Sequence, residues 1–241
     1  MIFKSLPVLM YHQVISNGEP DALCVTTEQL TKQLQHICDK GYTAISVQQL
    51  IDHYYLKTPL PKKPVLLTFD DGYQNNFTNL YPLLIKLNLK ATIFLTPHFI
   101  AQHSIGSNTY LSFEEIKQMD EKYIEFALHT FSHQSYSELS LPDITTDIEK
   151  TIAWFSTANI PLTPAHAYTY GAFPRDDKDK RLAMTKILQQ KGVKMAFRIG
   201  NRLNFLPLKD PFFIQRIDIR GTDSFAKFRR KLQFGAKYLL F

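Results

Sequence analysis

Residues 64–72 read Pro-Val-Leu-Leu-Thr-Phe-Asp-Asp-Gly, so an uninterrupted apolar run ends at two adjacent carboxylates, Asp70 and Asp71. A run of this kind is typical of a strand that is buried on both faces, as in a parallel sheet. Functional side chains of α/β proteins gather at the carboxyl ends of such strands. Two neighbouring carboxylates repel each other, and a cation beside them relieves the repulsion. The stretch therefore indicates either a cation site or a plain, solvated Asp-Asp-Gly turn.

The rest of the chain alternates strand-like and helix-like segments. Apolar runs predict strands at 7–11, 65–69, 91–95, 124–128, 167–170, 195–199 and 212–219. Helical spacing and N-cap residues predict helices at 27–39, 46–55, 75–87, 142–157, 179–190 and 224–234, and one more that Ser112 and Glu115 begin as a capping box. This alternation predicts a parallel sheet, either open or closed into a barrel. No linker divides the 241 residues, so we expect one domain over 1–241, with 222–241 as a basic amphipathic C-terminal helix or tail.

Two histidines follow the predicted strand at 124–128. The segment His129-Thr-Phe-Ser-His133 places them four residues apart, on one face of the chain if it turns helically. Imidazole and carboxylate together form a ligand set that suits Zn²⁺ and the neighbouring first-row metals. Because Asp70 and Asp71 end another strand, the combination favours a metal site over two unrelated turns.

His12 ends the first apolar run, again at the carboxyl end of a predicted strand. Imidazole titrates near neutral pH, so His12 is a candidate general acid or base. The sequence around it is equally typical of a half-buried histidine with a purely structural role.

Residues 68–72 and 129–133 resemble the first two motifs of the NodB-type polysaccharide deacetylases, carbohydrate esterase family four. Members of this family are metal-dependent and remove acetyl groups from N-acetylated sugars. The opening residues 7–12, and their spacing to Asp70, are most similar to the poly-N-acetylglucosamine deacetylase branch, the PgaB/IcaB type. The resemblance spans about residues 7–220. It implies an α/β fold, a single-domain distorted (β/α)7 barrel.

The resemblance also implies a role for each motif residue. Asp71, His129 and His133 would hold a divalent metal, with zinc expected and cobalt, nickel or manganese as alternatives. Asp70 would be the general base that acts on a metal-activated water. In this branch the acid histidine comes from the N-terminal strand, which His12 matches. The implied reaction removes the N-acetyl group from an N-acetylated amino sugar or polysaccharide precursor.

The third family motif is altered in this chain. It reads Tyr168-Thr-Tyr-Gly171, so Thr169 stands where the family has proline, and the loss of proline predicts a looser loop. The resemblance assigns the backbone N–H of Tyr170 to the oxyanion, and a backbone donor does not depend on side-chain identity. An arginine that tethers the catalytic base is expected at Arg216, with Arg175 as the alternative.

The net charge is +6, but the basic residues are dispersed except in residues 225–241, so no nucleic-acid partner is expected. The tail mixes basic and apolar residues and predicts either a terminal helix packed on the barrel or an interfacial helix on anionic lipid. The first residues lack a cleavage-site pattern, which predicts a cytoplasmic location, membrane-peripheral if the tail binds lipid. The sequence does not set the oligomeric state.

Two alternative functions remain open at this point. One is a catalytically inactive sugar-binding module on the same fold, which the altered position Thr169 favours and the intact acid-base residues disfavour. The other is an amidase for a different acylated amine, because a fold does not fix its substrate. Aromatic residues make up 13% of the chain, and Tyr73 and Phe131 are candidates for stacking on a sugar ring.

Overall fold

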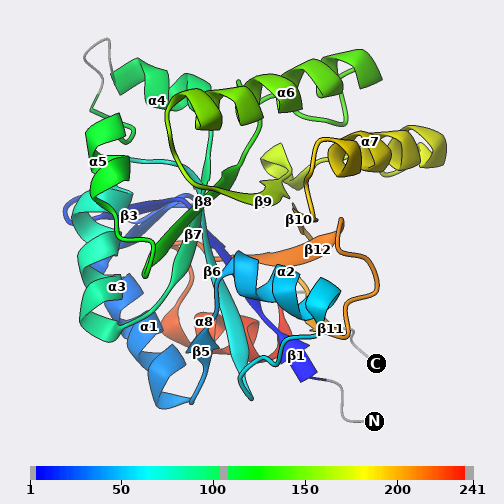
Figure 1. The fold of residues 1–241 in the computed structure, drawn as a ribbon. Coiled ribbons are helices and arrows are strands. Elements are labelled where there is room, and N and C mark those ends of the chain that lie inside the picture. Colours follow the sequence, from blue (N-terminus) through cyan, green and yellow to red (C-terminus); the bar gives the residue numbers. More distant parts are fainter. Residues whose placement is uncertain (1–3, 104–107, 237–241) are drawn as a thin grey trace.

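The fold is a closed barrel of seven parallel strands, seen in a computed structural model that describes residues 4–103 and 108–236 (Figure 1). The strands run around the ring in the order β2-β12-β10-β9-β8-β7-β6, and β2 pairs with β6 to close it. Their bounds are β2 (Val8–Tyr11), β6 (Pro64–Asp71), β7 (Ala91–Leu95), β8 (Ile124–Leu128), β9 (Leu162–Ala167), β10 (Met195–Ile199) and β12 (Ile214–Asp218). The predicted (β/α)7 barrel is confirmed.

Helices surround the barrel (Figure 1). They are α1 (Thr27–Asp39), α2 (Val47–Leu56), α3 (Tyr81–Leu87), α4 (Pro97–His103), α5 (Phe113–Gln118), α6 (Leu141–Thr157), α7 (Lys178–Gln190) and α8 (Phe225–Phe234). The short strands are β1 (Lys4–Leu6), β3 (Gln13–Ile15), β4 (Cys24–Thr26), β5 (Thr43–Ala44) and β11 (Asn204–Leu206). Ser112 and Glu115 form the predicted capping box of α5, with Ser112 accepting the Glu115 N–H.

Two hydrophobic clusters follow from the alternation of side chains along each strand. Leu66 and Phe94 belong to a cluster that fills the barrel interior together with residues of α2. Their neighbours Leu67 and Ile93 belong to a second cluster, which packs against the outer helices. Successive residues of a strand point to opposite faces, so the two clusters are the inside and the outside of one wall.

Helix α2 closes the barrel at the end where the strands begin. The buried side chains of α2 join the interior cluster, and the Glu125 carboxylate accepts the first N–H groups of the helix, from Val47 and Gln48. The same carboxylate accepts the hydroxyls of Thr92 and Thr163 on neighbouring strands. With this end covered, the opposite end, where the strands finish, is left for a functional site.

Two expected elements differ from the structure. The strand expected at 167–170 lies earlier, over β9, and residues 169–171 form a 3₁₀ turn in which Tyr170 has a φ of 57°, far from the extended values of a regular strand. The helix expected at 75–87 is divided into a π-turn, Asn76–Leu80, and α3. Pro82 at the start of α3 has no N–H to donate to the preceding turn, so a continuous α-helix cannot pass through it.

The C-terminal segment packs on the barrel through α8. Phe228, Lys231 and Leu232 face inward and are buried. The Lys231 ammonium pairs with the Asp223 carboxylate and donates to the Asp218 carbonyl oxygen at 2.6 Å. The helix expected at 224–234 is confirmed, and its buried Lys231 is not available to a lipid surface. The end of the predicted tail, 237–241, lies outside the described residues.

Within the described ranges, no helix has both the length and the apolarity that a membrane crossing requires.

His166 is a buried titratable residue outside the two histidine motifs. It lies on β9, stacks on the Tyr136 ring with centroids 4.9 Å apart, and hydrogen-bonds through neither ring nitrogen within the described chain. Burial, reinforced by the positive charges of His129 and Arg216, lowers the pKa of His166 to about 3.

We predict that His166 makes the fold acid-sensitive. Between pH 6.5 and about 3 the unfolded chain binds a proton at His166 and the folded chain does not, so the free energy of unfolding falls as pH falls through that window. His166→Phe should flatten this dependence in urea unfolding at pH 7.5 and pH 5, whereas exposed His98→Phe should not. Equal slopes for His166→Phe and the wild-type protein would contradict the prediction.

Candidate functional site

The carboxyl ends of three barrel strands bring charged side chains together. Asp70 lies near the end of β6, His129 follows β8, and Arg216 lies on β12 beside Ile199 of β10. Asp70 and Arg216 continue the alternation of the interior residues Leu66 and Ile214, so both point into the barrel mouth. All three are at least 98% buried.

Arg216 and Asp70 form a bidentate ion pair inside the barrel. Nη1 donates to Oδ1 at 2.6 Å and Nη2 donates to Oδ2 at 2.8 Å. The guanidinium carbon lies 5.5 Å from the centroid of the Phe94 ring. Burial opposes the ionised form of Asp70, but the charges of Arg216 and His129 outweigh it and hold the pKa of Asp70 below its usual range. Asp70 is therefore a fixed, ionised carboxylate at neutral pH.

Asp71 lies next to both motif histidines. Its Oδ1 is 3.4 Å from Nε2 of His129 and 3.1 Å from Nε2 of His133, and the three ligand atoms lie within 4.8 Å of one another. Oδ1 is buried and accepts no hydrogen bond of acceptable geometry within the described residues. A buried carboxylate oxygen without a partner is costly, and a cation at the centre of the three atoms would remove that cost.

Hydrogen bonds at Nδ1 of His129 and His133 orient the two rings so that each Nε2 is available to a metal. His129 Nδ1 donates to the Ala167 carbonyl oxygen at 2.8 Å, which leaves Nε2 of the neutral ring with a free lone pair. His133 Nδ1 lies 3.2 Å from the hydroxyl of Tyr170, which accepts its proton when Nε2 is a ligand. One carboxylate and two imidazoles with room for water form a donor set that fits a catalytic divalent metal.

The backbone of the site adopts the left-handed region at four residues that are not glycine. Their φ angles are 75° at Asp71, 60° at Thr130, 61° at His133 and 57° at Tyr170. Such conformations cost of the order of 1–3 kcal/mol each, and they persist only where the surrounding structure holds them. Gly72 also has a φ of 75°, and a Cβ there would lie 2.7 Å from Leu95. The strained backbone turns these side chains toward one another.

Asp147, on α6, anchors the loop between the two histidines through hydrogen bonds. Its carboxylate accepts the Phe131 N–H at 2.9 Å and the Tyr136 hydroxyl at 2.8 Å. Thr96, which follows β7, donates to the carbonyl oxygen of His129 at 2.9 Å. The positions of both histidines thus depend on α6 and β7. Sequence reasoning missed Asp147 because a single acidic residue in an amphipathic helix carries no distinguishing signal.

Thr169 ties the third motif to the second. Its hydroxyl lies 3.2 Å from that of Thr130, and both side chains are fully buried. A Cβ at Gly171 would lie 2.5 Å from the Ile199 nitrogen, so only glycine fits where the loop meets β10. These contacts hold the loop against β10 and the second motif. Within the described residues the Tyr170 N–H donates to no backbone carbonyl.

His12 follows β2, which lies between the strands that carry Asp70 and Arg216. Its side chain is half-buried, and its charge is among those that lower the pKa of both Asp70 and Asp71. His12 thus belongs to the same cluster. Arg175, the alternative to Arg216 as tether, lies elsewhere, in a pocket beside Phe173.

An aromatic wall leads away from His133. Phe99 lies 5.2 Å from the His133 ring, Tyr110 stacks on Phe99 at 4.5 Å, and Tyr73 stacks on Tyr110 at 5.0 Å. Tyr170 flanks His133 on another side, with ring centroids 4.8 Å apart, and is 67% exposed. Sequence reasoning named Tyr73 and Phe131 for stacking; Tyr73 is in this wall, and Phe99 and Tyr110 were missed.

Comparison with known proteins identifies relatives of this chain. Residues 57–196 match the family model described as polysaccharide deacetylase. The putative polysaccharide deacetylase YxkH of Bacillus subtilis is 33% identical over 139 residues, which are 56% of this chain and 46% of that protein. The poly-beta-1,6-N-acetyl-D-glucosamine N-deacetylase of Staphylococcus aureus strain MRSA252 is 23% identical over 219 residues, 87% of this chain and 72% of that protein. The match thus spans less than half of the Bacillus protein.

The fold also has solved counterparts. The Streptococcus pyogenes deacetylase PplD, solved in complex with acetate, superposes with a TM-score of 0.80 at 22% identity, covering 97% of this chain and 99% of that one. At this identity the likeness establishes the fold, and it agrees with the barrel described above.

We predict that the Tyr170 hydroxyl contributes to metal binding through His133. Tyr170→Phe should weaken the affinity for Zn²⁺ by about 10-fold or more, because the proton on Nδ1 loses its acceptor. Titration of metal-free protein against a zinc-binding dye measures this affinity. Tyr123→Phe, which removes a hydroxyl away from the site, should leave it unchanged; equal affinities for Tyr170→Phe and wild type would refute the role.

We predict that the Asp70–Arg216 pair is coupled in stability. Arg216→Met leaves a buried carboxylate without its partner, so it should lower the free energy of unfolding by about 3–5 kcal/mol. Asp70→Asn with Arg216→Met should cost less than the sum of the single changes. Urea unfolding of the four proteins measures the coupling, and strict additivity would contradict it.

Proposed function

The chain belongs to the polysaccharide deacetylase family, and we propose that it is a metal-dependent hydrolase that removes the acetyl group from an N-acetylated amino sugar. The donor set of Asp71, His129 and His133 carries this proposal, because their ligand atoms converge, and among the described residues the buried Asp71 Oδ1 faces only the two imidazole nitrogens. An inactive sugar-binding module would have no use for a buried, unpaired carboxylate oxygen. The altered Thr169 gives that alternative little support, since its hydroxyl holds the loop.

Asp71, His129 and His133 would hold the metal, with zinc the best match to the ligand types. A divalent metal bound there would activate water as a nucleophile and polarise the acetyl carbonyl. The hydrogen bonds from His129 Nδ1 to the Ala167 carbonyl oxygen and from His133 Nδ1 to the Tyr170 hydroxyl would keep the two rings oriented toward the metal.

Asp70 would act as the general base. Arg216 keeps it ionised and oriented, and each carboxylate oxygen retains a lone pair beyond the one that the guanidinium uses. Asp70 would take the proton of the attacking water, because it lies beside the donor set, with Oδ2 3.9 Å from Nε2 of His129. Its lowered pKa makes it a weak base that is fully ionised at neutral pH, so positioning compensates for limited basicity.

His12 would act as the general acid. Cleavage of an acetamide requires a proton on the leaving nitrogen, since an amide anion is a poor leaving group. As the imidazolium, His12 would donate that proton from the strand that separates β6 from β12. The free N–H of Tyr170 would donate to the oxygen on which negative charge develops.

The aromatic wall of Phe99, Tyr110 and Tyr73 supports a sugar as the acylated amine. The three rings are stacked on one another, so the edges and outer faces of the stack form the apolar surface that would contact the apolar face of a pyranose. A saccharide lying along this wall would reach the donor set beside His133. The other open reading, an amidase for a small acylated amine, would have no need of an extended wall.

We predict that Asp70→Asn separates catalysis from metal binding. With a poly-N-acetylglucosamine oligosaccharide as substrate, kcat measured by acetate release should fall about 10²- to 10⁴-fold. Bound zinc should remain near one per chain, because the ligand atoms belong to Asp71 and the two histidines. Exposed Asp39→Asn is the control and should retain wild-type kinetics. Near wild-type turnover by Asp70→Asn would show that Asp70 is not the base.

A further inference from the structure

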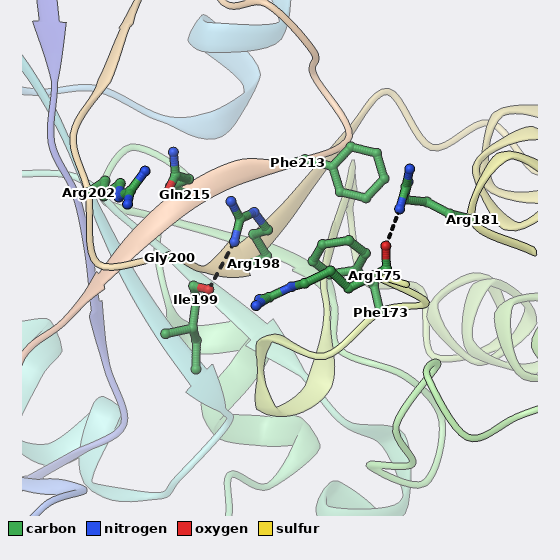
Figure 2. Close-up of a pocket in the computed structure, with 9 residues that line it drawn as sticks. All are labelled: Phe173, Arg175, Arg181, Arg198, Ile199, Gly200, Arg202, Phe213 and Gln215. Atoms are coloured by element: carbon green, nitrogen blue, oxygen red, sulfur yellow. Dashed lines mark hydrogen bonds between the residues drawn. The ribbon is translucent and has the colours of Figure 1, made fainter. Parts of the chain in front are cut away.

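A second pocket, of about 470 Å³, lies beside the Tyr170 loop and is lined by four arginines (Figure 2). They are Arg175, Arg181, Arg198 and Arg202, and Phe173 and Phe213 contribute aromatic walls. None of the lining residues is acidic. We call this feature the arginine pocket.

The arginines of this pocket form no ion pair with the described part of the chain. Across residues 4–103 and 108–236, the ion pairs involve none of the four. Arg181 donates to the carbonyl oxygen of Arg175, and Arg198 reaches only the carbonyl oxygen of Ile199 at 3.4 Å (Figure 2). Nε of Arg198 is buried and has no hydrogen-bond partner within the same residues. The pocket therefore holds one buried donor without a partner, on Arg198, beside the solvent-exposed guanidinium groups of Arg175 and Arg202.

The positive charges are also held close to one another. The guanidinium carbons of Arg175 and Arg198 lie 5.7 Å and 5.6 Å from the centroid of the same Phe173 ring. Burial, together with the charges of Arg175 and Arg202, lowers the pKa of Arg198. Like charges gathered in a concave site are unfavourable without an anion, and planar guanidinium groups match the oxygens of phosphate in bidentate geometry.

The arginine pocket lies near the Tyr170 loop of the candidate active site. Phe173 follows Tyr170 by three residues and Arg175 follows it by five, a stretch that spans at most about 18 Å even when fully extended. Ile199 packs on Gly171 and lines the pocket. Gln215 lines it too, from the outer face of β12, whereas the next residue, Arg216, points into the barrel mouth and holds Asp70. An extended substrate whose acetamido group lies at the donor set would have to cross the Tyr170 loop to reach the pocket.

We propose that the arginine pocket binds a phosphate group carried by the substrate, so that the enzyme acts on a phosphorylated or nucleotide-linked N-acetylated sugar in preference to a neutral one. This inference rests on the proposed deacetylase function and names its substrate class. Arg175 and Arg198, which both lie over the Phe173 ring, are the principal phosphate ligands, and the two phenylalanines shape the opening.

Kinetics test the preference with matched substrates. Acetate release is measured with a neutral N-acetylglucosamine oligosaccharide, the same oligosaccharide bearing a phosphate monoester at its reducing end, and UDP-N-acetylglucosamine. At least one phosphate-bearing substrate should show a KM lower by about tenfold or more, since each charge-assisted hydrogen bond contributes substantially. The substrate that shows the advantage identifies the source of the phosphate.

The variant Arg175→Gln/Arg198→Gln should bring the KM ratio of neutral to phosphorylated substrate close to one, and 0.5 M salt should reduce the ratio for the wild-type protein. Arg229→Gln, which removes an exposed positive charge on α8, should leave the ratio unchanged. A ratio near one for the wild-type protein, or a ratio that the double variant retains, would overturn the proposal.

Direct binding separates this proposal from the deacetylase function. Calorimetric titration with inorganic pyrophosphate should show binding to the wild-type protein, weaker binding to Arg198→Lys, and none to the double variant. This result supports the pocket even if no substrate releases acetate, in which case the proposed function alone fails. Absence of pyrophosphate binding to the wild-type protein overturns the pocket.

Discussion

The buried ion pair between Arg216 and Asp70 is the constraint around which the barrel mouth is organised. Its two partners lie on β12 and β6, and β2 runs between them, so the pair reaches across the interior of the closed ring. Two carboxylates side by side in a buried site repel each other, and the guanidinium neutralises one of them. That leaves Asp71 as the carboxylate that faces the two histidines. A buried ion pair is a poor source of stability, and its value here is to fix charge and geometry.

The geometry of the donor set depends on backbone strain that the surrounding structure maintains. Asp71, Thr130, His133 and Tyr170 all occupy the left-handed region, and each belongs to one of the three loops at the mouth. Asp147 holds the histidine loop from α6, while the Thr130–Thr169 hydroxyl pair links that loop to the third motif. The packing of the barrel and helices thus offsets the cost of these backbone conformations, which a short peptide would not adopt.

The sequence predicted the barrel and the main candidate residues because those signals are local. Apolar runs such as 64–69 mark buried strands, and the residues that end them were already expected to meet at one edge. The Tyr170 hydroxyl, Asp147 and the arginine pocket could not be predicted in this way. Their contacts join residues far apart in the chain, and the three-residue turn at 169–171 that aims Tyr170 has no periodicity to detect. The burial of Lys231 could not be predicted either, because an amphipathic pattern does not reveal that its ammonium group pairs with Asp223.

Metal dependence of acetate release is the most direct test of this account. The wild-type protein, stripped with a chelator and then supplied with one equivalent of Zn²⁺, should lose and regain acetate release from an N-acetylglucosamine oligosaccharide. A variant with His129→Ala and His133→Ala should regain none, because two of the three ligand atoms are missing. Acetate release that persists without metal, or that the double variant regains on adding Zn²⁺, would contradict the central claim.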